Sequence, residues 1–312
     1  MKEMPGTREK MFLVPLLALI LASCAGEGTP SPGPTSPWRS VPSGTAQDLL
    51  GVAFGSGGFV AVGGGPFQSL ILTSTDGSSW TQRPSDAGVQ LTGIAYAEGK
   101  YLAVGFDNVV LLSSDGISWQ KVNGPQGVGY LNEVAFGGGR WVATGAFGYL
   151  LVSQDASAQS WQVVNLDANE LTGVAYGGGR FVVVGQLGKI FTSTDALAWQ
   201  EVPSGTNRNL GSVAYGGGLF VAVGAGGTLL TSRDGLSWTS QSLPSAPDLR
   251  AVAYGNGTFY AVGSGNKAYV SQDGLSWREE TLPGEYTLTG LAYGQTLGRW
   301  VAVGFSGTIF RR

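Results

Sequence analysis

Six aspartates occupy the same position of a recurring turn, and they are the most repeated residues in the chain that could do chemistry. They are Asp76, Asp115, Asp155, Asp195, Asp234 and Asp273, each followed four to six residues later by a tryptophan. Carboxylates suggest calcium, but calcium takes roughly six to eight oxygens at one point, and these aspartates fall in separate repeats. Aspartate also accepts backbone N–H groups across a turn. We therefore predict structural turns and no metal site.

Two further residues depart from the pattern of the repeat. At one position of the inner strand the copies carry small residues, except for Glu133, and at the preceding position Arg250 is the exception. Inner strands of a ring line its channel, so these two side chains could bind a ligand or could line a solvated channel, which is the simpler interpretation. Because paired carboxylates hydrolyse glycosidic bonds, a glycosidase-like mechanism with Glu133 as first candidate stays an alternative.

Other chemistries lack the residues that they need. The chain contains no histidine, which excludes Ser-His-Asp catalysis and histidine-ligated zinc. Gly-rich stretches such as Gly177–Gly179 lie between two predicted strands, whereas a phosphate-binding loop opens a helix. Charged residues make up 12% of the chain and the net charge is −3, without a basic cluster, which argues against nucleic acid. We expect no catalytic residues and no cofactor.

A repeat of 38 to 42 residues is marked by tryptophans at positions 38, 80, 119, 161, 199, 238 and 277. One unit, residues 171–203, contains four short runs rich in Val, Phe and Tyr that Gly clusters separate, a pattern typical of strands. Four short antiparallel strands in each repeat of about 40 residues predict the blade of a propeller. The expected fold class is all-β, a seven-bladed β-propeller with four-stranded antiparallel blades.

The two ends of the repeat region complement each other. The last unit, Leu288 to Arg312, stops after its third strand, whereas Trp38 to Pro42 is an isolated fourth strand before the first complete unit. Pairing these segments would close the ring and remove an exposed sheet edge. We therefore expect the N-terminal outer strand to complete the last blade.

The turn before each tryptophan resembles the Asp box, the bacterial neuraminidase repeat of sialidases, sortilin-type receptors and photosystem II assembly factors. Most copies, such as Ser232-Arg-Asp-Gly-Leu-Ser-Trp238, are one residue shorter than the family pattern Ser/Thr-x-Asp-x-Gly-x-x-Trp. The resemblance runs through six copies and implies a propeller of the sialidase-like superfamily, in which Asp boxes are structural turns. A sialidase also needs three arginines and a Phe/Tyr-Arg-Ile-Pro motif. That motif is missing, and only Arg208 and Arg250 fall on the appropriate face.

Residues 1–23 are predicted to be a lipoprotein signal peptide. A short basic head precedes an apolar run, Met11 to Ala22, which is too short for a permanent membrane span. Leu21-Ala-Ser-Cys24 resembles the lipobox of bacterial lipoproteins, which implies cleavage before Cys24 and acylation of its thiol. An ordinary secretory signal with an incidental cysteine is the alternative.

The rest of the chain then divides into two parts. Residues 24–37 are the lipidated cysteine and a tether of Pro, Gly and Ser, and residues 38–312 are the propeller. We expect an exported protein that is lipid-anchored to the bacterial membrane, the outer one if the host has one, with its domain in the periplasm or outside the cell.

Ligands of such folds usually meet the face opposite the Asp turns, which the loops between the second and third strands and between units form. The candidate residues on that face are Phe67, Phe106, Tyr130, Glu133, Phe147, Tyr149, Arg208, Arg250 and Tyr286. Exposed aromatic side chains among them would anchor a partner.

The sequence therefore favours a non-catalytic binding or scaffold module for a protein or glycan partner in the cell envelope. We expect a monomer that contacts the membrane through its lipid anchor only. Two alternatives stay open: a degenerate sialidase-like glycosidase that uses carboxylates near the channel, and an assembly factor for an envelope or membrane complex.

Overall fold

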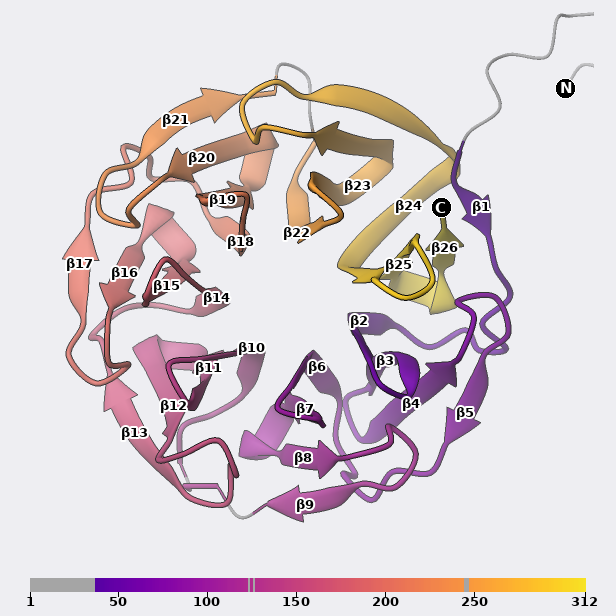
Figure 1. Ribbon diagram of the computed structural model, residues 1–312. Coiled ribbons are helices and arrows are strands. Elements are labelled where there is room, and N and C mark those ends of the chain that lie inside the picture. Colours follow the sequence, from indigo (N-terminus) through magenta and orange to yellow (C-terminus); the bar gives the residue numbers. More distant parts are fainter. Residues whose placement is uncertain (1–36, 123, 126, 244–246) are drawn as a thin grey trace, which may run out of the picture. The chain divides into compact units, whose positions relative to one another are not determined.

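The computed structural model describes residues 37–122, 124–125, 127–243 and 247–312. The predicted signal peptide, Cys24 and all but the last residue of the predicted tether lie outside these ranges. The described residues belong to one compact unit, Ser36–Arg312, whose sheets stand around a central axis (Figure 1). No helix in the described ranges is long and apolar enough to cross a membrane.

Five sheets have four strands each, and within every sheet the strands follow the order of the sequence. These sheets are β2 (Leu49–Gly55), β3 (Gly58–Gly65), β4 (Gln68–Ser74), β5 (Thr81–Arg83); β6 (Leu91–Ala97), β7 (Lys100–Gly105), β8 (Val110–Ser113), β9 (Gln120–Val122); β10 (Leu131–Gly137), β11 (Arg140–Gly145), β12 (Tyr149–Ser153), β13 (Trp161–Asn165); β14 (Leu171–Gly177), β15 (Arg180–Gly185), β16 (Ile190–Ser193), β17 (Gln200–Val202); and β18 (Leu210–Gly216), β19 (Leu219–Gly224), β20 (Thr228–Ser232), β21 (Thr239–Ser242).

The sixth sheet has six strands in the order β1-β26-β25-β24-β23-β22. Its members are β1 (Arg39–Ser40), β22 (Leu249–Gly255), β23 (Thr258–Ser271), β24 (Arg278–Gly294), β25 (Arg299–Gly304) and β26 (Ile309–Arg311). Five short 3-10 turns connect second and third strands: η1 (Phe106–Asn108), η2 (Ala146–Gly148), η3 (Gln186–Gly188), η4 (Ala225–Gly227) and η5 (Phe305–Gly307).

The prediction of seven separate blades is wrong, because the described strands form six sheets. The last two sequence repeats share the six-stranded sheet. Its strand β24 pairs with β23 through residues such as Thr281 and with β25 from Leu288 onward. In the four-stranded sheets a loop separates the outer strand of one unit from the inner strand of the next. In β24 the chain stays extended across that point, so one strand serves two repeat units.

The two ends of the described chain meet as the complementary segments predict. Strand β1 pairs with β26 in antiparallel register, with Arg39 opposite Arg311 and Ser40 opposite Phe310. The backbone N–H of Val41 adds a bond of 2.9 Å to the carbonyl of Ile309. The indigo and yellow ends of the chain lie side by side in Figure 1, so the edge of β26 is covered.

The second strand of each unit is buried on both faces because neighbouring sheets pack against it. Strands β15 and β19 show this pattern, with five and six consecutive buried residues. Inner strands are tied to one another by side chains at a shared irregularity in register. The hydroxyl of Thr172 donates to the carbonyl of Leu210 at 2.7 Å, and that of Thr289 donates to the carbonyl of Leu49, also at 2.7 Å. The second of these bonds crosses between the end and the beginning of the repeat region.

Each of the six aspartate turns is organised by its own carboxylate. In the second unit, Asp115 Oδ1 accepts the N–H groups of Ile117 and Ser118, both at 2.8 Å. The hydroxyl of Ser113 donates to the same oxygen and accepts the N–H of Gly116 at 2.8 Å. These bonds form an Asx turn, so this carboxylate is occupied by its own backbone.

The aspartate turns predict a loss of stability in acid. Backbone N–H donors lower the pKa of five of the carboxyls, those of Asp76 and Asp273 to about 2, and the Ser157 hydroxyl, followed by the Ser157 N–H, lowers the pKa of Asp155. Because the folded pKa lies below the unfolded one, the stabilisation is present above about pH 4 and is lost as the pH falls towards 2. We expect the melting temperature to drop across that window, and less steeply in an Asp76→Asn/Asp273→Asn variant; identical profiles would contradict this.

Candidate functional site

The end of the sheets opposite the Asp turns carries the turns between second and third strands. In the 3-10 turns η1 to η5 the central residue is left-handed, with φ between 53° and 60°. In η2 and η3 these residues are Phe147 and Leu187, for which a left-handed backbone costs roughly 1–2 kcal/mol. Glycine occupies the same place in η4, as Gly226. Two bulky apolar residues therefore stand where glycine would be free of strain.

Several of these turns, and the β3–β4 hairpin at the equivalent place in the first unit, expose large apolar side chains to solvent. We call this set the apolar turn face; it comprises Phe67, Phe106, Phe147, Leu187 and Phe305. Phe67 is 91% exposed at the tip of the β3–β4 hairpin, and Phe147 is 69% exposed. Single exposed apolar residues are ordinary, but here they recur at equivalent turns of five units.

Loops between units hold these turns in place. The N–H of Leu187 donates to Asn209 Oδ1 at 2.9 Å, and that of Gly226 donates to Asp248 Oδ1 at 2.8 Å. Asp48 Oδ1 accepts the N–H of Ser306 in the same way, at 2.9 Å. The central amide of η3, η4 and η5 is thus satisfied by the following unit, which fixes these three turns relative to the sheets.

The predicted aromatic residues fall into two groups. Phe106 stacks on Tyr130, with ring centroids 5.2 Å apart and planes 19° from parallel. Burial and the neighbouring Glu170 raise the pKa of the Tyr130 hydroxyl. Tyr149 is partly buried and packs against a core cluster. Tyr286 makes an edge-to-face contact with Phe310, with ring centroids 4.9 Å apart. Phe106 is exposed, whereas all three tyrosines are half-buried, and Tyr149 and Tyr286 contribute to packing.

The two arginines predicted on this face, Arg208 and Arg250, do not converge on one binding site. Arg208 is exposed and donates from Nη1 to the carbonyl of Gly226 at 2.9 Å. Arg250 lies on β22 with its guanidinium carbon 5.8 Å from the ring centroid of Phe305, a cation–π contact. Each arginine therefore braces a different turn of the same face.

Glu133 and Arg250 both line a cavity of about 180 Å³ between the inner strands. Glu133 is the only acid among the described residues that line it. Its Oε1 accepts the N–H of Val134 at 3.2 Å, and burial raises the pKa of the Glu133 carboxyl to about 7. A paired-carboxylate hydrolysis needs a second acid, which the described lining of this cavity does not supply.

Replacing Glu133 with glutamine is expected to stabilise the fold by an amount that depends on pH. The folded pKa of Glu133 lies above its unfolded value of 4.5, so the folded state is penalised as the pH rises from about 4.5 through 7. Glu133→Gln keeps the acceptor for Val134 and removes the charge. We expect an unchanged melting temperature at pH 4 and a higher one at pH 8. An equal shift at both pH values would contradict the assignment.

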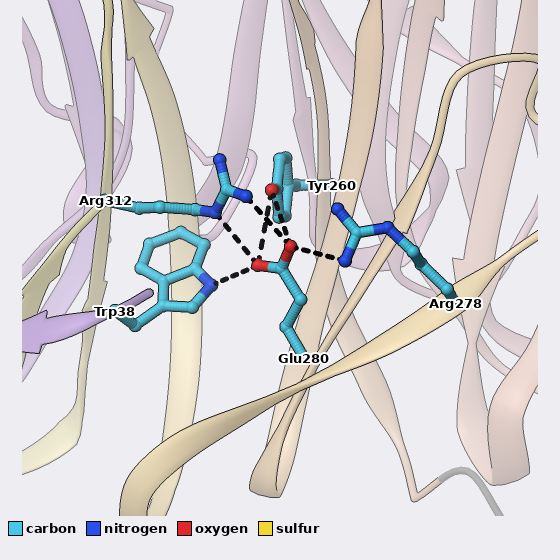
Figure 2. Close-up of polar contacts among 5 residues, drawn as sticks. All are labelled: Trp38, Tyr260, Arg278, Glu280 and Arg312. Atoms are coloured by element: carbon cyan, nitrogen blue, oxygen red, sulfur yellow. Dashed lines mark hydrogen bonds and ion pairs between the residues drawn. The ribbon is translucent and has the colours of Figure 1, made fainter. Parts of the chain in front are cut away.

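A second polar cluster, which the comparison of repeats did not reveal, joins β23 and β24 to Trp38 and Arg312 near the two ends of the described chain (Figure 2). Its centre is Glu280 of β24, whose side chain is 4% exposed. Trp38 Nε1 donates to Oε2 at 3.1 Å, and the Tyr260 hydroxyl lies 3.3 Å from both oxygens. Arg312 approaches through Nε and Nη2, both at 3.0 Å, and Arg278 through Nη1 at 2.8 Å. We call these five residues the seam cluster.

The signal for the seam cluster was present in the sequence. Glu280 stands where other units carry Val122 and Val202, and Tyr260 stands where they carry Val182 and Val221. Burial, followed by the Glu280 charge, raises the pKa of the Tyr260 hydroxyl to about 12, so it stays a donor at neutral pH. A search for outliers along second and outer strands as well as inner ones would have found both residues.

Comparison with known proteins places the chain among β-propellers. Residues 211–303, less than half of the chain, match the family model of the DUF6242 beta propeller domain. No curated protein matches it. Among solved structures, YCF48 bound to D1 peptide is similar with a TM-score of 0.70 at 18% identity, over 88% of this chain and 96% of that one. YCF48 from Cyanidioschyzon merolae is similar with a TM-score of 0.67 at 16% identity, over 88% and 98% of the two chains.

These likenesses establish the class of fold. Identities of 16% and 18% carry no residue-level correspondence, so they show the architecture alone. Together with the family match they show that the chain folds as a β-propeller.

Proposed function

We propose that the protein is a non-catalytic propeller that binds a protein partner through the apolar turn face. The observation that carries this proposal is the recurrence of exposed Phe and Leu side chains at equivalent turns, two of them on a strained backbone. Strained backbone conformations cluster at ligand-binding sites, where the surrounding structure holds them in place. The structural similarity to YCF48, of which one form is bound to D1 peptide, supports a protein as the partner.

The proposal extends to the place where binding occurs. Lipidation of Cys24 would hold the propeller at a bacterial envelope membrane, and the predicted tether would let it reach a partner there. The partner would be an envelope protein, and a role in assembling an envelope complex is one form that such binding could take. Mass spectrometry of the mature N-terminus tests the anchor: an unmodified Cys24, or cleavage elsewhere, overturns this part.

A pair of matched variants tests the binding face. Phe67→Ser/Phe147→Ser/Leu187→Ser removes three anchors of the apolar turn face. The control Ile117→Ser/Leu236→Ser/Leu275→Ser removes three exposed apolar residues, 36–47% exposed, at the Asp-turn end. With the tagged protein in its native envelope, site-specific photo-crosslinking should yield one stoichiometric partner. We expect that product to disappear in the first variant and to persist in the control; equal yields overturn the proposal.

Leu187→Gly separates binding from stability. Glycine relieves the left-handed strain at φ 56° and matches Gly226 of the next unit. We expect the free energy of unfolding to stay the same or rise by about 0.5–1 kcal/mol, while the crosslinking yield falls. A large loss of stability in urea unfolding would show that Leu187 is needed for packing and would contradict the binding role.

A further inference from the structure

At six junctions between neighbouring units, the Asp turn of one unit covers the second strand of the preceding unit. A Cβ added to Gly116 would lie 2.7 Å from Val60 Cγ2, and one on Gly235 would lie 3.0 Å from Val182 Cγ2. Gly77 and Gly274 meet Val301 and Val221 in the same way. At the other two junctions, Ala158 shares a core cluster with Leu102, and Ala196 shares one with Val142. A close-packed polypeptide turn thus seals each of these junctions.

The seam between β26 and β1 differs from the other junctions. Among the described residues no Asp turn lies between β26 and β1. Where that turn would cover β23, a cavity of about 690 Å³ opens. Its walls include Thr258, Tyr260, Trp277, Arg278, Trp300 and Arg312. This volume falls in the range of ordinary ligand sites, roughly 300–1,000 Å³.

The charges around this cavity balance. Arg278 and Arg312 both pair with the buried Glu280, and Asp273 lines the rim with Oδ1 held by its own turn. Two cations therefore face two anions, and the cavity does not favour an anionic ligand. The side chain of Arg278 is 64% exposed and directs Nη1 to Glu280, so other N–H groups of its guanidinium can reach a carbonyl in the cavity.

At another junction an arginine side chain donates a hydrogen bond to the main-chain carbonyl of an Asp turn. Arg299 Nη1 donates to the main-chain carbonyl of Asp76 at 2.5 Å, across the junction between the last and the first units. At the seam, Thr258 occupies the repeat position equivalent to that of Arg299. Arg278 and Arg312 flank the cavity there. Aromatic side chains complete the walls, which suits a turn that carries an apolar residue.

We propose that the seam cavity binds a polypeptide turn of the Asp-Gly type from a partner protein, which occupies the position that an Asp turn occupies at the other junctions. The turn's carbonyls accept from Arg278 and Arg312, and its apolar residue contacts Trp277 and Trp300. This site lies at the end of the sheets opposite the apolar turn face, so it goes beyond the proposed function and stands or falls separately.

The test titrates the full chain with a fluorescent peptide of the sequence Ser271 to Trp277, SQDGLSW, followed by anisotropy. We expect saturable one-to-one binding, and weaker binding of a peptide with asparagine in place of the aspartate, because the turn loses its organising acceptor. Thr258→Arg installs the residue that Arg140, Arg180 and Arg299 represent in other units. We expect it to raise the affinity about five-fold and Arg278→Ala to lower it about five-fold, the effect of one hydrogen bond.

Several controls make the result decisive. Arg233→Ala removes an exposed arginine from another Asp turn and should leave peptide affinity unchanged, as should the Phe67→Ser/Phe147→Ser/Leu187→Ser variant. Circular dichroism and thermal unfolding of every variant confirm the fold. The proposal is overturned by no binding at millimolar peptide, by equal binding of a scrambled peptide, or by unchanged affinity in both Thr258→Arg and Arg278→Ala. Binding of an oligosaccharide that the peptide does not displace and that Arg278→Ala abolishes also overturns it.

Discussion

Glu280→Ala is expected to lower the free energy of unfolding by about 3–5 kcal/mol. The buried carboxylate accepts hydrogen bonds from Trp38, Tyr260, Arg278 and Arg312. Alanine would leave the Trp38 and Tyr260 donors without this acceptor and would leave the Arg312 charge without its paired anion. Urea denaturation followed by tryptophan fluorescence measures the change.

The neighbouring glutamate provides the control for this prediction. Glu279 is exposed and pairs with Lys267 at 2.5 Å on the surface, so Glu279→Ala should cost less than about 1 kcal/mol. A second variant, Glu280→Val/Arg312→Leu, restores the valine of other units and removes the charge left unpaired. We expect it to recover part of the loss. If Glu280→Ala were as mild as Glu279→Ala, the seam cluster would not hold the ring together.

Trp38→Ala is the other substitution with a large expected effect, about 3–5 kcal/mol of unfolding free energy. Trp38 is 1% exposed. Its ring contacts that of Tyr260 edge-on, with ring centroids 5.5 Å apart and ring planes at 82°. Its loss would leave a cavity beside β1, a strand of only two residues. Because β1 is tied to the ring by few other bonds, we expect it to separate from β26.

Trp119→Ala is the matched control for Trp38→Ala. Trp119 opens an equivalent outer strand but is half-buried and follows its third strand directly in the chain, so its loss should cost roughly half as much. The Trp38→Ala/Glu280→Ala double variant should lose less than the sum of the single losses by 1 kcal/mol or more, since the residues share one network. Additive losses in this cycle would show that the two side chains act independently.

The periodic tryptophans were enough to predict short antiparallel strands in a ring and the pairing of its two ends. They were not enough to count the sheets. Gly265 and Pro283–Gly284 are residues of the types that form loops, yet β23 and β24 run through these positions as continuous strands. Whether the chain leaves a sheet at such a point depends on pairing partners, here Gly265 with Tyr286, and not on local turn residues.

The residues of the candidate site were likewise only partly predictable from the sequence. Comparing repeats singled out Glu133 and Arg250, and both line the inner cavity. The same comparison did not reveal that Phe147 and Leu187 adopt a left-handed backbone, because the glycine that would signal it is absent there. It also could not show the seam cavity, which lies beside β23 where the described residues place no Asp turn. A cavity of this kind can be recognised only in the folded structure, where the neighbouring units surround it.

The short strand β1 also determines when the fold can be completed. Its bonds to β26, and that of Trp38 to Glu280, join residues 242 or more positions apart. Closing so long a loop costs conformational entropy before any contact compensates for it, so folding rates fall as such contacts dominate. We infer that the ring closes last during folding and opens first during unfolding. Amide hydrogens of β1 and β26 should therefore exchange with solvent before those of β15, which lies far from the seam.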